Sequence, residues 1–192
     1  MIVVFASGSG TNFEAIATAF PEQIIALICN KETAPVINKA HAKNIPCFVI
    51  SHNKFSSRAD HEIEIINKLK TLKNIKVIAL AGYMRVLSPT FFKELKKITP
   101  TPLLINLHPA NLEKYKGAHA YEHAVENKYN KWELTVHEVI EELDSGRVLN
   151  STEFEIYPNE SSAQVQARVR PLEHKLLIDT LSKILFTESL SQ

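Results

Sequence analysis

Three polar side chains, an amide, an imidazole and a carboxylate, stand at points of the sequence where they could act on one ligand. Asn106 and His108 lie two residues apart at the end of the apolar run "LLINLHP", and Asp144 lies in the turn "EELDSG". Residues i and i+2 of an extended strand point the same way, and Pro109 cannot continue a central strand, so the amide and the imidazole should project together. A nearby carboxylate raises the pKa of an imidazole, and we therefore expect Asp144 to hold His108 protonated.

Each of these residues also has a purely structural interpretation. A polar residue within a strand is most often a satisfied structural group, and an aspartate in a turn most often caps its own backbone. Because Asn106 and His108 stand together at the end of one strand, a functional site is favoured over two separate structural roles.

The sequence supplies this set with no obvious nucleophile and no strong metal motif. The segment "SGSG" lacks the flanking residues of a G-x-S-x-G nucleophile elbow. His119 and His123 have the spacing of a zinc-binding helix, but Ala120 stands where H-E-x-x-H has its glutamate. We interpret these two histidines as rim residues and expect no metal. The remaining chemistry is transfer between two bound substrates, in which one substrate supplies the nucleophile.

The loop "ASGSGTNF" near the N-terminus is the strongest signal for an anion. It joins an apolar run to a helical stretch, and the N–H groups at a helix N-terminus favour negative charge. A dinucleotide fits less well, because Phe13 replaces the third glycine of the Rossmann fingerprint, and Asn30 and Lys31 stand where an acidic residue is needed. The loop therefore predicts a site for one phosphate.

The elements that would position these residues follow an α/β pattern. Runs without polar alternation predict strands buried on both faces, at residues 2–6, 24–29, 47–50, 77–82 and 103–107. Helical stretches alternate with them, at residues 12–20, 34–43, 57–72 and 88–97. The third of these helices should bury the stripe Ile63, Ile66, Leu69 and Leu72. This order predicts a mostly parallel, Rossmann-like mononucleotide-binding sheet with helices on both faces.

The pattern changes after Lys128. Residues 133–140 and 147–156 alternate without a helix between them, which predicts an antiparallel C-terminal extension. Residues 161–186 predict a long helix that Ser161 or Ser162 caps and that Pro171 should kink or interrupt.

Length and composition restrict the class of protein. The 192 residues suit a single domain, which we divide into a phosphate-binding half at 1–100 and a catalytic half at 101–192. A net charge of +1 gives no support to a nucleic-acid surface, and no run approaches the length of a membrane span. Cys29 and Cys47 are interpreted as reduced core thiols of a cytoplasmic protein.

Five motifs, taken in order, give the chain a resemblance to a known enzyme family. They are "SGSGTN", "AGYMRVLSP", "INLHPANLEKYKG", "TVHEVIEELDSG" and "ARVRPLEH". From Ile2 to about Lys175 the chain resembles the folate-dependent glycinamide ribonucleotide formyltransferases of purine synthesis. The resemblance implies the formyltransferase fold and transfer of the formyl group of 10-formyltetrahydrofolate, as co-substrate, to the amine of glycinamide ribonucleotide.

The resemblance also implies roles for individual residues. Asn106, His108 and Asp144 fall on catalytic positions, where the amide and the protonated imidazole would bind the formyl oxyanion and the carboxylate would help to move the amine proton. Glycinamide ribonucleotide would be bound by Gly10, Thr11, Asn12, Phe13, Arg170, Pro171, Leu172 and Glu173. Folate would be bound by Arg58, Met84, Arg85, Val86, Leu87, Asn106, Ile140, Glu141, Glu142, Leu143 and Asp144.

Three residues depart from the family pattern without touching the catalytic positions. Glu113 replaces a proline, Glu133 replaces a glycine, and Ser145 stands where a glycine is common. These departures bear on loop shape, and through it on folate affinity, more than on the reaction.

Related activities remain as alternatives. Methionyl-tRNA formyltransferase carries an additional C-terminal domain and formyltetrahydrofolate deformylase an additional N-terminal one, and we expect neither here. A non-catalytic module that binds a phosphorylated ligand is the alternative from another class. As partners we expect small-molecule substrates, with no nucleic acid and no membrane, and a monomer or weak homodimer.

Overall fold

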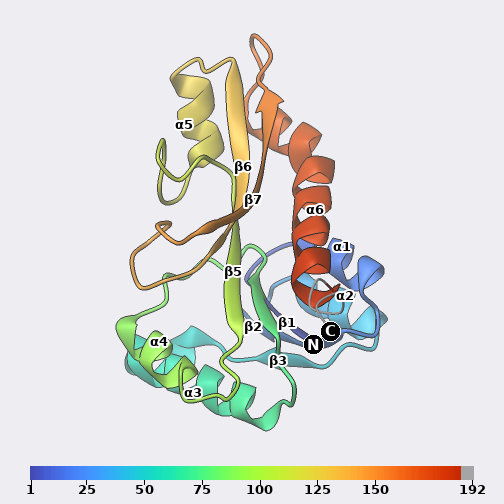
Figure 1. Ribbon diagram of the computed structural model, residues 1–192, viewed down its shortest axis with the longest axis vertical. Coiled ribbons are helices and arrows are strands. Elements are labelled where there is room, and N and C mark those ends of the chain that lie inside the picture. The colour runs from blue at the N-terminus through green and yellow to red at the C-terminus, as the bar shows by residue number, and fades with distance from the viewer. Residues whose placement is uncertain (187–192) are drawn as a thin grey trace. The chain divides into compact units, whose positions relative to one another are not determined.

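The computed structural model describes residues 1–186 of the chain, and its strands form one seven-stranded sheet (Figure 1). The strands are β1 (Ile2–Ala6), β2 (Ile24–Cys29), β3 (Cys47–Val49), β4 (Val77–Leu80), β5 (Leu103–His108), β6 (Lys131–Glu138) and β7 (Val148–Glu155). The helices are α1 (Thr11–Ala19), α2 (Val36–Ala42), the 3-10 turn η1 (His52–Lys54), α3 (Arg58–Thr71), α4 (Pro89–Leu95), α5 (Ala120–Glu126) and α6 (Ser162–Phe186).

The strand order explains where the ligand-binding edge of the sheet lies. The order is β3-β2-β1-β4-β5-β6-β7, and β1 pairs in parallel with both β2 and β4. Because crossovers between parallel strands are right-handed, the helices that lead from β1 toward β3 cover one face and those that lead back toward β5 cover the other. The order reverses between β1 and β4, and the loops that follow these two strands form the topological switch point.

The sheet is mixed, as the sequence predicts. β6 and β7 run antiparallel, with Trp132 opposite Phe154 and Leu134 opposite Thr152. The register shifts between Val136 and His137, which marks a bulge near the end of β6. The predicted α/β class with an antiparallel C-terminal extension is confirmed.

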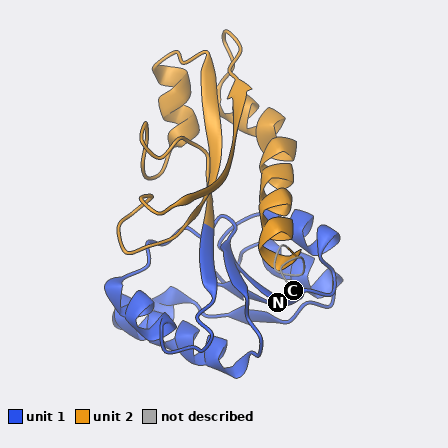
Figure 2. Ribbon diagram, viewed as in Figure 1, with its two compact units in different colours: residues 1–105 blue, residues 106–192 orange. Residues whose placement is uncertain are grey.

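The chain consists of two compact units (Figure 2). The first is Met1–Ile105 and the second begins at Asn106, so the boundary falls within β5. The first unit buries its strands almost completely: every residue of β1 and β4 is inaccessible or nearly so. In the second unit α6 packs on β6, β7 and α5. No helix within residues 1–186 is long and apolar enough to cross a bilayer.

The buried face of α3 differs from the predicted one. Ile63 is exposed, and the face that packs inward carries His61, Glu62, Ile65, Ile66 and Leu69. Two polar residues take inward positions because each has a partner there: His61 Nε2 lies 2.9 Å from the Ile50 carbonyl, and Glu62 accepts hydrogen bonds from the Ser88 backbone and side chain. The apolar spacing alone therefore predicts the wrong position for Ile63: it places this residue on the buried face of α3, but Ile63 is exposed.

The long C-terminal helix is present, but Pro171 does not interrupt it. α6 is assigned without a break from Ser162 to Phe186, with Pro171 inside it. Proline removes the donor for the carbonyl four residues earlier, and here both Pro171 and Ala167 are exposed, so water can satisfy that carbonyl. Ser161 is the predicted cap, since its hydroxyl accepts from the Gln164 N–H at 3.3 Å and Gln164 Oε1 accepts from the Ser161 N–H at 2.9 Å.

The two cysteines are unpaired, and only one lies in the core. Cys29 is fully buried at the end of β2. Cys47 is half-buried, because it begins the short strand β3 at one edge of the sheet. The interpretation of Cys47 as a core thiol is therefore corrected.

Candidate active site

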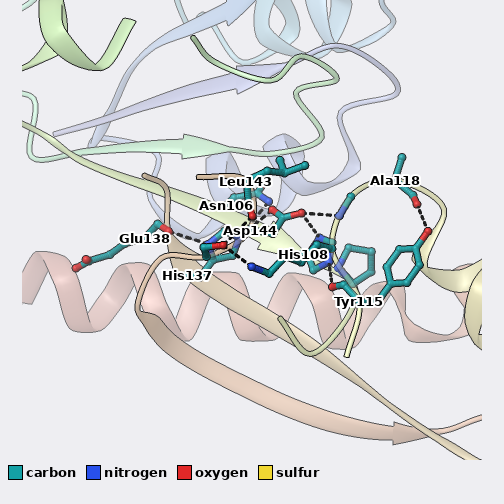
Figure 3. A network of polar contacts seen from close by, with 12 residues as sticks. Asn106, His108, Tyr115, Ala118, His137, Glu138, Leu143 and Asp144 are labelled. Carbon is teal, nitrogen blue, oxygen red and sulfur yellow. Dashed lines mark hydrogen bonds and ion pairs between the residues drawn. The ribbon is translucent and has the colours of Figure 1, made fainter. Parts of the chain in front are cut away.

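The end of β5 brings the amide and the imidazole into one polar cluster with two residues that follow later in the chain. β5 ends at His108, just before Pro109. The side chains of Asn106 and His108 therefore project together from the end of this strand. His108 Nδ1 lies 3.6 Å from Asp144 Oδ2, and Asn106 Nδ2 lies 3.4 Å from His137 Nε2 (Figure 3). All four residues belong to the second unit. The structure thus unites the three residues that the sequence singled out and adds His137.

His108 is held from two sides and buried. Its Nε2 lies 3.0 Å from the Tyr115 carbonyl, which requires a proton on that nitrogen, and its Nδ1 faces Asp144. Burial is the largest influence and lowers the pKa of His108; the Asp144 carboxylate and the Tyr115 carbonyl act to raise it but do not restore its ordinary value. Burial therefore disfavours the charged form of His108, contrary to the expectation that Asp144 holds it protonated.

Asp144 is a buried carboxylate that accepts from a backbone N–H and faces two imidazoles. Burial acts to raise the pKa of Asp144, but the influence of the nearby His137 and the hydrogen bond from the Gly117 N–H outweigh it, so the pKa lies below its ordinary value. The Gly117 N–H donates to Oδ2 at 2.8 Å, and His137 Nε2 lies 3.5 Å from Oδ1. With a φ of 45°, Asp144 adopts a left-handed conformation that few aspartates adopt, and such strained residues gather at functional sites.

Gly146 lets the turn after Asp144 pass close to β6. A Cβ at this position would overlap the backbone carbonyl of Glu138. The Glu138 N–H also donates to the Arg147 carbonyl at 2.9 Å, which ties the two ends of the Asp144 loop together. Only glycine leaves enough room for the Glu138 carbonyl at this position. The close approach of the turn to β6 accompanies the placement of Asp144 beside His108.

His137 is the member of the cluster that the sequence did not single out. It is 1% exposed, and its Nδ1 lies 2.7 Å from the Glu138 carbonyl, which places the proton on Nδ1 and leaves Nε2 to accept from the Asn106 amide. His137 therefore fixes which way the Asn106 amide turns. His137 lies at the register shift between Val136 and His137, and bulges of this kind re-aim a side chain.

The loop of residues 109–119 supplies the backbone groups that hold the cluster. The Trp132 indole N–H donates to the Pro109 carbonyl at 2.7 Å, and Asn111 Nδ2 donates to the Glu133 carboxylate at 2.7 Å. Lys116 Nζ donates to the Ser145 hydroxyl at 2.5 Å. Two of the three departures from the family pattern, Glu133 and Ser145, thus fasten the loop that carries the Tyr115 carbonyl and the Gly117 N–H.

The glycine loop of the first unit has the geometry of an anion site. Gly10 begins α1 with a φ of 72°, and a Cβ there would overlap Val36, so only glycine fits. The N–H groups of the first helical turn, at Thr11, Asn12 and Phe13, have no acceptor within a helix and point outward. The Asn12 Oδ1 is buried without a hydrogen-bond partner among the described residues, which leaves this side chain available to a ligand.

Residues expected to bind folate occupy loops in both units. In the first unit Met84 is 72% exposed and Val86 is exposed, whereas Leu87 is buried and can contribute only its backbone. Arg58 is exposed in the first turn of α3, where a cation opposes the helix dipole and adds nothing to stability. In the second unit the residues from Ile140 to Leu143 are exposed ahead of the buried Asp144.

The segment expected to bind the ribose lies on α6. Arg170 and Glu173 are one turn apart on the same face, Leu172 is half-buried, and Pro171 is exposed. Glu173 is buried, and Tyr121 of α5 donates a 2.6 Å hydrogen bond to its Oε1.

The two histidines interpreted as rim residues differ in environment. His119 precedes α5 and is exposed beside Glu122. His123 stacks on the Tyr115 ring with 4.4 Å between ring centroids. No cluster of three or more His, Cys, Asp or Glu within residues 1–186 is arranged to hold a metal ion.

Comparison with known proteins places this arrangement in a family. The family model described as formyl transferase matches residues 1–181. A phosphoribosylglycinamide formyltransferase of Dictyostelium discoideum is 35% identical over 97% of this chain and 98% of its own length, and that of Bacillus subtilis is 33% identical over 95% and 93%. The crystal structure of glycinamide ribonucleotide transformylase 1 from Geobacillus kaustophilus covers 96% of this chain and 97% of its own, with 35% identity and a TM-score of 0.86. The chain therefore belongs to the formyl transferase family, among the phosphoribosylglycinamide formyltransferases.

Proposed function

We propose that this protein transfers the formyl group of 10-formyltetrahydrofolate to the amine of glycinamide ribonucleotide, giving formylglycinamide ribonucleotide and tetrahydrofolate in purine biosynthesis. The observation that carries the proposal is the cluster of Asn106, His108 and Asp144, in which the buried imidazole lies 3.6 Å from the buried carboxylate. Relatives named for this activity match nearly the whole chain.

The first step is attack of the substrate amine on the formyl carbon. A new carbon–nitrogen bond forms and negative charge develops on the formyl oxygen. One N–H of Asn106 is engaged by His137, and its second N–H donates to this oxyanion. Removal of one such donor commonly costs on the order of a hundredfold in rate.

The second requirement is to move the proton that the amine releases. His108 Nδ1 and Asp144 Oδ2 face each other at 3.6 Å, and both carry lone pairs in the free enzyme. A proton entering between them is stabilised by both groups, and the resulting imidazolium also neutralises the oxyanion. The pair then gives the proton to the folate nitrogen as the bond from that nitrogen to the formyl carbon breaks.

Substrate binding divides among the loops as follows. The phosphate is held by backbone N–H groups of Gly10, Thr11, Asn12 and Phe13, and the ribose by the segment from Arg170 to Glu173. Each unit by itself offers exposed apolar side chains that suit a flat pteridine, Met84 and Val86 in the first unit and Ile140 and Leu143 in the second, and Arg58 suits a carboxylate of the folate tail. The reaction assigned to the chain's own side chains needs no metal.

The remaining parts of the proposal concern context. The protein acts on small molecules as a single formyltransferase domain, as a monomer or weak homodimer, and binds neither nucleic acid nor membrane. A cytoplasmic location is supported by the unpaired thiols of Cys29 and Cys47, which suit a reducing compartment.

An acceptor-dependence assay tests the proposed function. The protein is mixed with 10-formyltetrahydrofolate, with and without glycinamide ribonucleotide, and tetrahydrofolate release is followed. The proposal predicts release only when the acceptor is present. Equal release without the acceptor would indicate a hydrolase, and no release in either case would indicate a non-catalytic binding module.

A further inference from the structure

Tyr121 and Glu173 form a buried polar pair that the transfer chemistry leaves unused. The Tyr121 hydroxyl, from α5, donates to Glu173 Oε1, from α6, at 2.6 Å. Tyr121 is 5% exposed and Glu173 is 8% exposed. A carboxylate buried this deeply is costly unless its oxygens have donors, so its full set of partners has to be accounted for.

Among the residues that the structure describes, only one oxygen of this carboxylate accepts a hydrogen bond. Within residues 1–186 no group donates a hydrogen bond to Glu173 Oε2. Arg170 acts on the carboxylate through its charge but forms no ion pair with it in the part of the chain that the structure describes. Burial raises the pKa of Glu173, against the lowering effects of the Tyr121 hydroxyl and Arg170. A carboxylate fixed through one oxygen and lacking a donor on the other is ready to accept from a ligand hydroxyl.

We propose that Tyr121 is a positioning residue for acceptor binding: its hydroxyl fixes the Glu173 carboxylate so that Oε2 receives the ribose hydroxyls of glycinamide ribonucleotide. The proposal rests on the proposed function, which puts the ribose at the segment from Arg170 to Glu173. Tyr121 acts through Glu173 and does not touch the substrate.

The phenol also determines the charge that the ribose meets. A hydroxyl that donates to a carboxylate stabilises its ionised form, and only that form accepts from two ribose hydroxyls at once. Without this donor, Glu173 should take up a proton at higher pH and turn away from its present orientation. A tyrosine that only joined α5 to α6 would support stability but would not change how acceptor affinity varies with pH.

Tyr121→Phe tests the proposal, because it removes one oxygen and keeps the ring. Tyr157→Phe is the matched control: Tyr157 is exposed, and its ring packs against Arg168 without a described partner for the hydroxyl. Glycinamide ribonucleotide binding is measured by calorimetry across a pH series, and steady-state kinetics and melting temperatures are measured alongside.

The expected result is selective for the acceptor. Tyr121→Phe should weaken glycinamide ribonucleotide binding about tenfold or more, the usual effect of losing a hydrogen bond to a charged group. kcat at saturation and the KM for 10-formyltetrahydrofolate should stay within about twofold of the wild type, since only uniform binding of the acceptor is lost. As the pH is lowered, the affinity for glycinamide ribonucleotide should begin to fall at a higher pH in Tyr121→Phe than in the wild type or in Tyr157→Phe.

Other outcomes would overturn the proposal in distinguishable ways. Unchanged acceptor affinity and pH dependence in Tyr121→Phe, with wild-type transfer intact, would remove Tyr121 from its role and leave the proposed function standing. A lower melting temperature with equal losses in affinity for both substrates would make the pair purely structural. A wild-type protein that does not bind glycinamide ribonucleotide would remove the proposed function and the Tyr121 assignment with it.

Discussion

His137 controls the site through the orientation of one amide. Its Nε2 accepts from Asn106 and its Nδ1 donates to the Glu138 carbonyl, so the ring connects the Asn106 amide to the backbone of β6. Because an amide can turn over without changing its shape, a fixed acceptor is needed to present the N–H rather than the oxygen to the substrate.

Substitution of His137 should therefore impair the chemical step rather than binding. In His137→Leu we expect kcat to fall by about tenfold or more, within the range seen when an oxyanion donor is lost, with the KM for glycinamide ribonucleotide unchanged. His41→Leu, on the exposed side of α2, is the control. A kcat within twofold of the wild type would show that Asn106 holds its orientation without His137.

The burial of the His108 ring should appear in the pH dependence of stability. An unfolded histidine titrates near about pH 6.5, and the folded pKa of His108 lies lower, so between these values the unfolded chain binds more protons. The stability contribution is present above the unfolded pKa and is lost as the pH falls toward the folded pKa. Denaturant unfolding is measured at about pH 7.5 and about pH 5.5. Between the higher and the lower pH, the free energy of unfolding should decrease more for the wild type than for His108→Asn. Equal losses would mean that burial does not disfavour the charged ring.

At the scale of elements, the loop of residues 109–119 is fastened to its neighbours by side chains. Asn111 reaches Glu133 of β6, and Lys116 reaches Ser145 beyond Asp144. The Tyr115 carbonyl and the Gly117 N–H, which hold His108 and Asp144, depend on the shape of this loop.

A double-mutant cycle on Asn111 and Glu133 tests that dependence. Each change to alanine should destabilise the protein by about 1 kcal/mol, and the two should couple by about 0.5–1 kcal/mol because they remove the same hydrogen bond. Both variants should also have reduced kcat, since the loop holds the catalytic pair. If the two single changes in unfolding free energy simply add in the double variant and turnover stays normal, the loop keeps its shape without this bond.

Elements were more predictable from the sequence than the contacts between them. Uninterrupted apolar runs identify strands buried on both faces, and the i, i+2 spacing of Asn106 and His108 identifies a shared side of β5. Ile63 was misassigned because the partners of His61 and Glu62, which decide the phase of α3, lie elsewhere in the chain. His137 sits in an apolar strand, where a functional ring and a structural one have the same sequence pattern, and the Tyr115 carbonyl is a backbone group with no sequence signal.

At the scale of the whole molecule, the chain is an α/β protein whose polar cluster of Asn106, His108, His137 and Asp144 lies entirely in the unit that begins at Asn106. We propose that Asn106, His108 and Asp144 act in the direct transfer of a formyl group between two bound substrates. Label carried on the formyl carbon of 10-formyltetrahydrofolate can be followed into formylglycinamide ribonucleotide while tetrahydrofolate is quantified in the same reaction.

That measurement is made on the wild type and on His108→Ala, whose fold is checked by circular dichroism. We predict one labelled product per tetrahydrofolate released by the wild type, and turnover reduced by about a hundredfold or more in His108→Ala. Label released as free formate, or transfer by His108→Ala at close to the wild-type rate, would contradict the account.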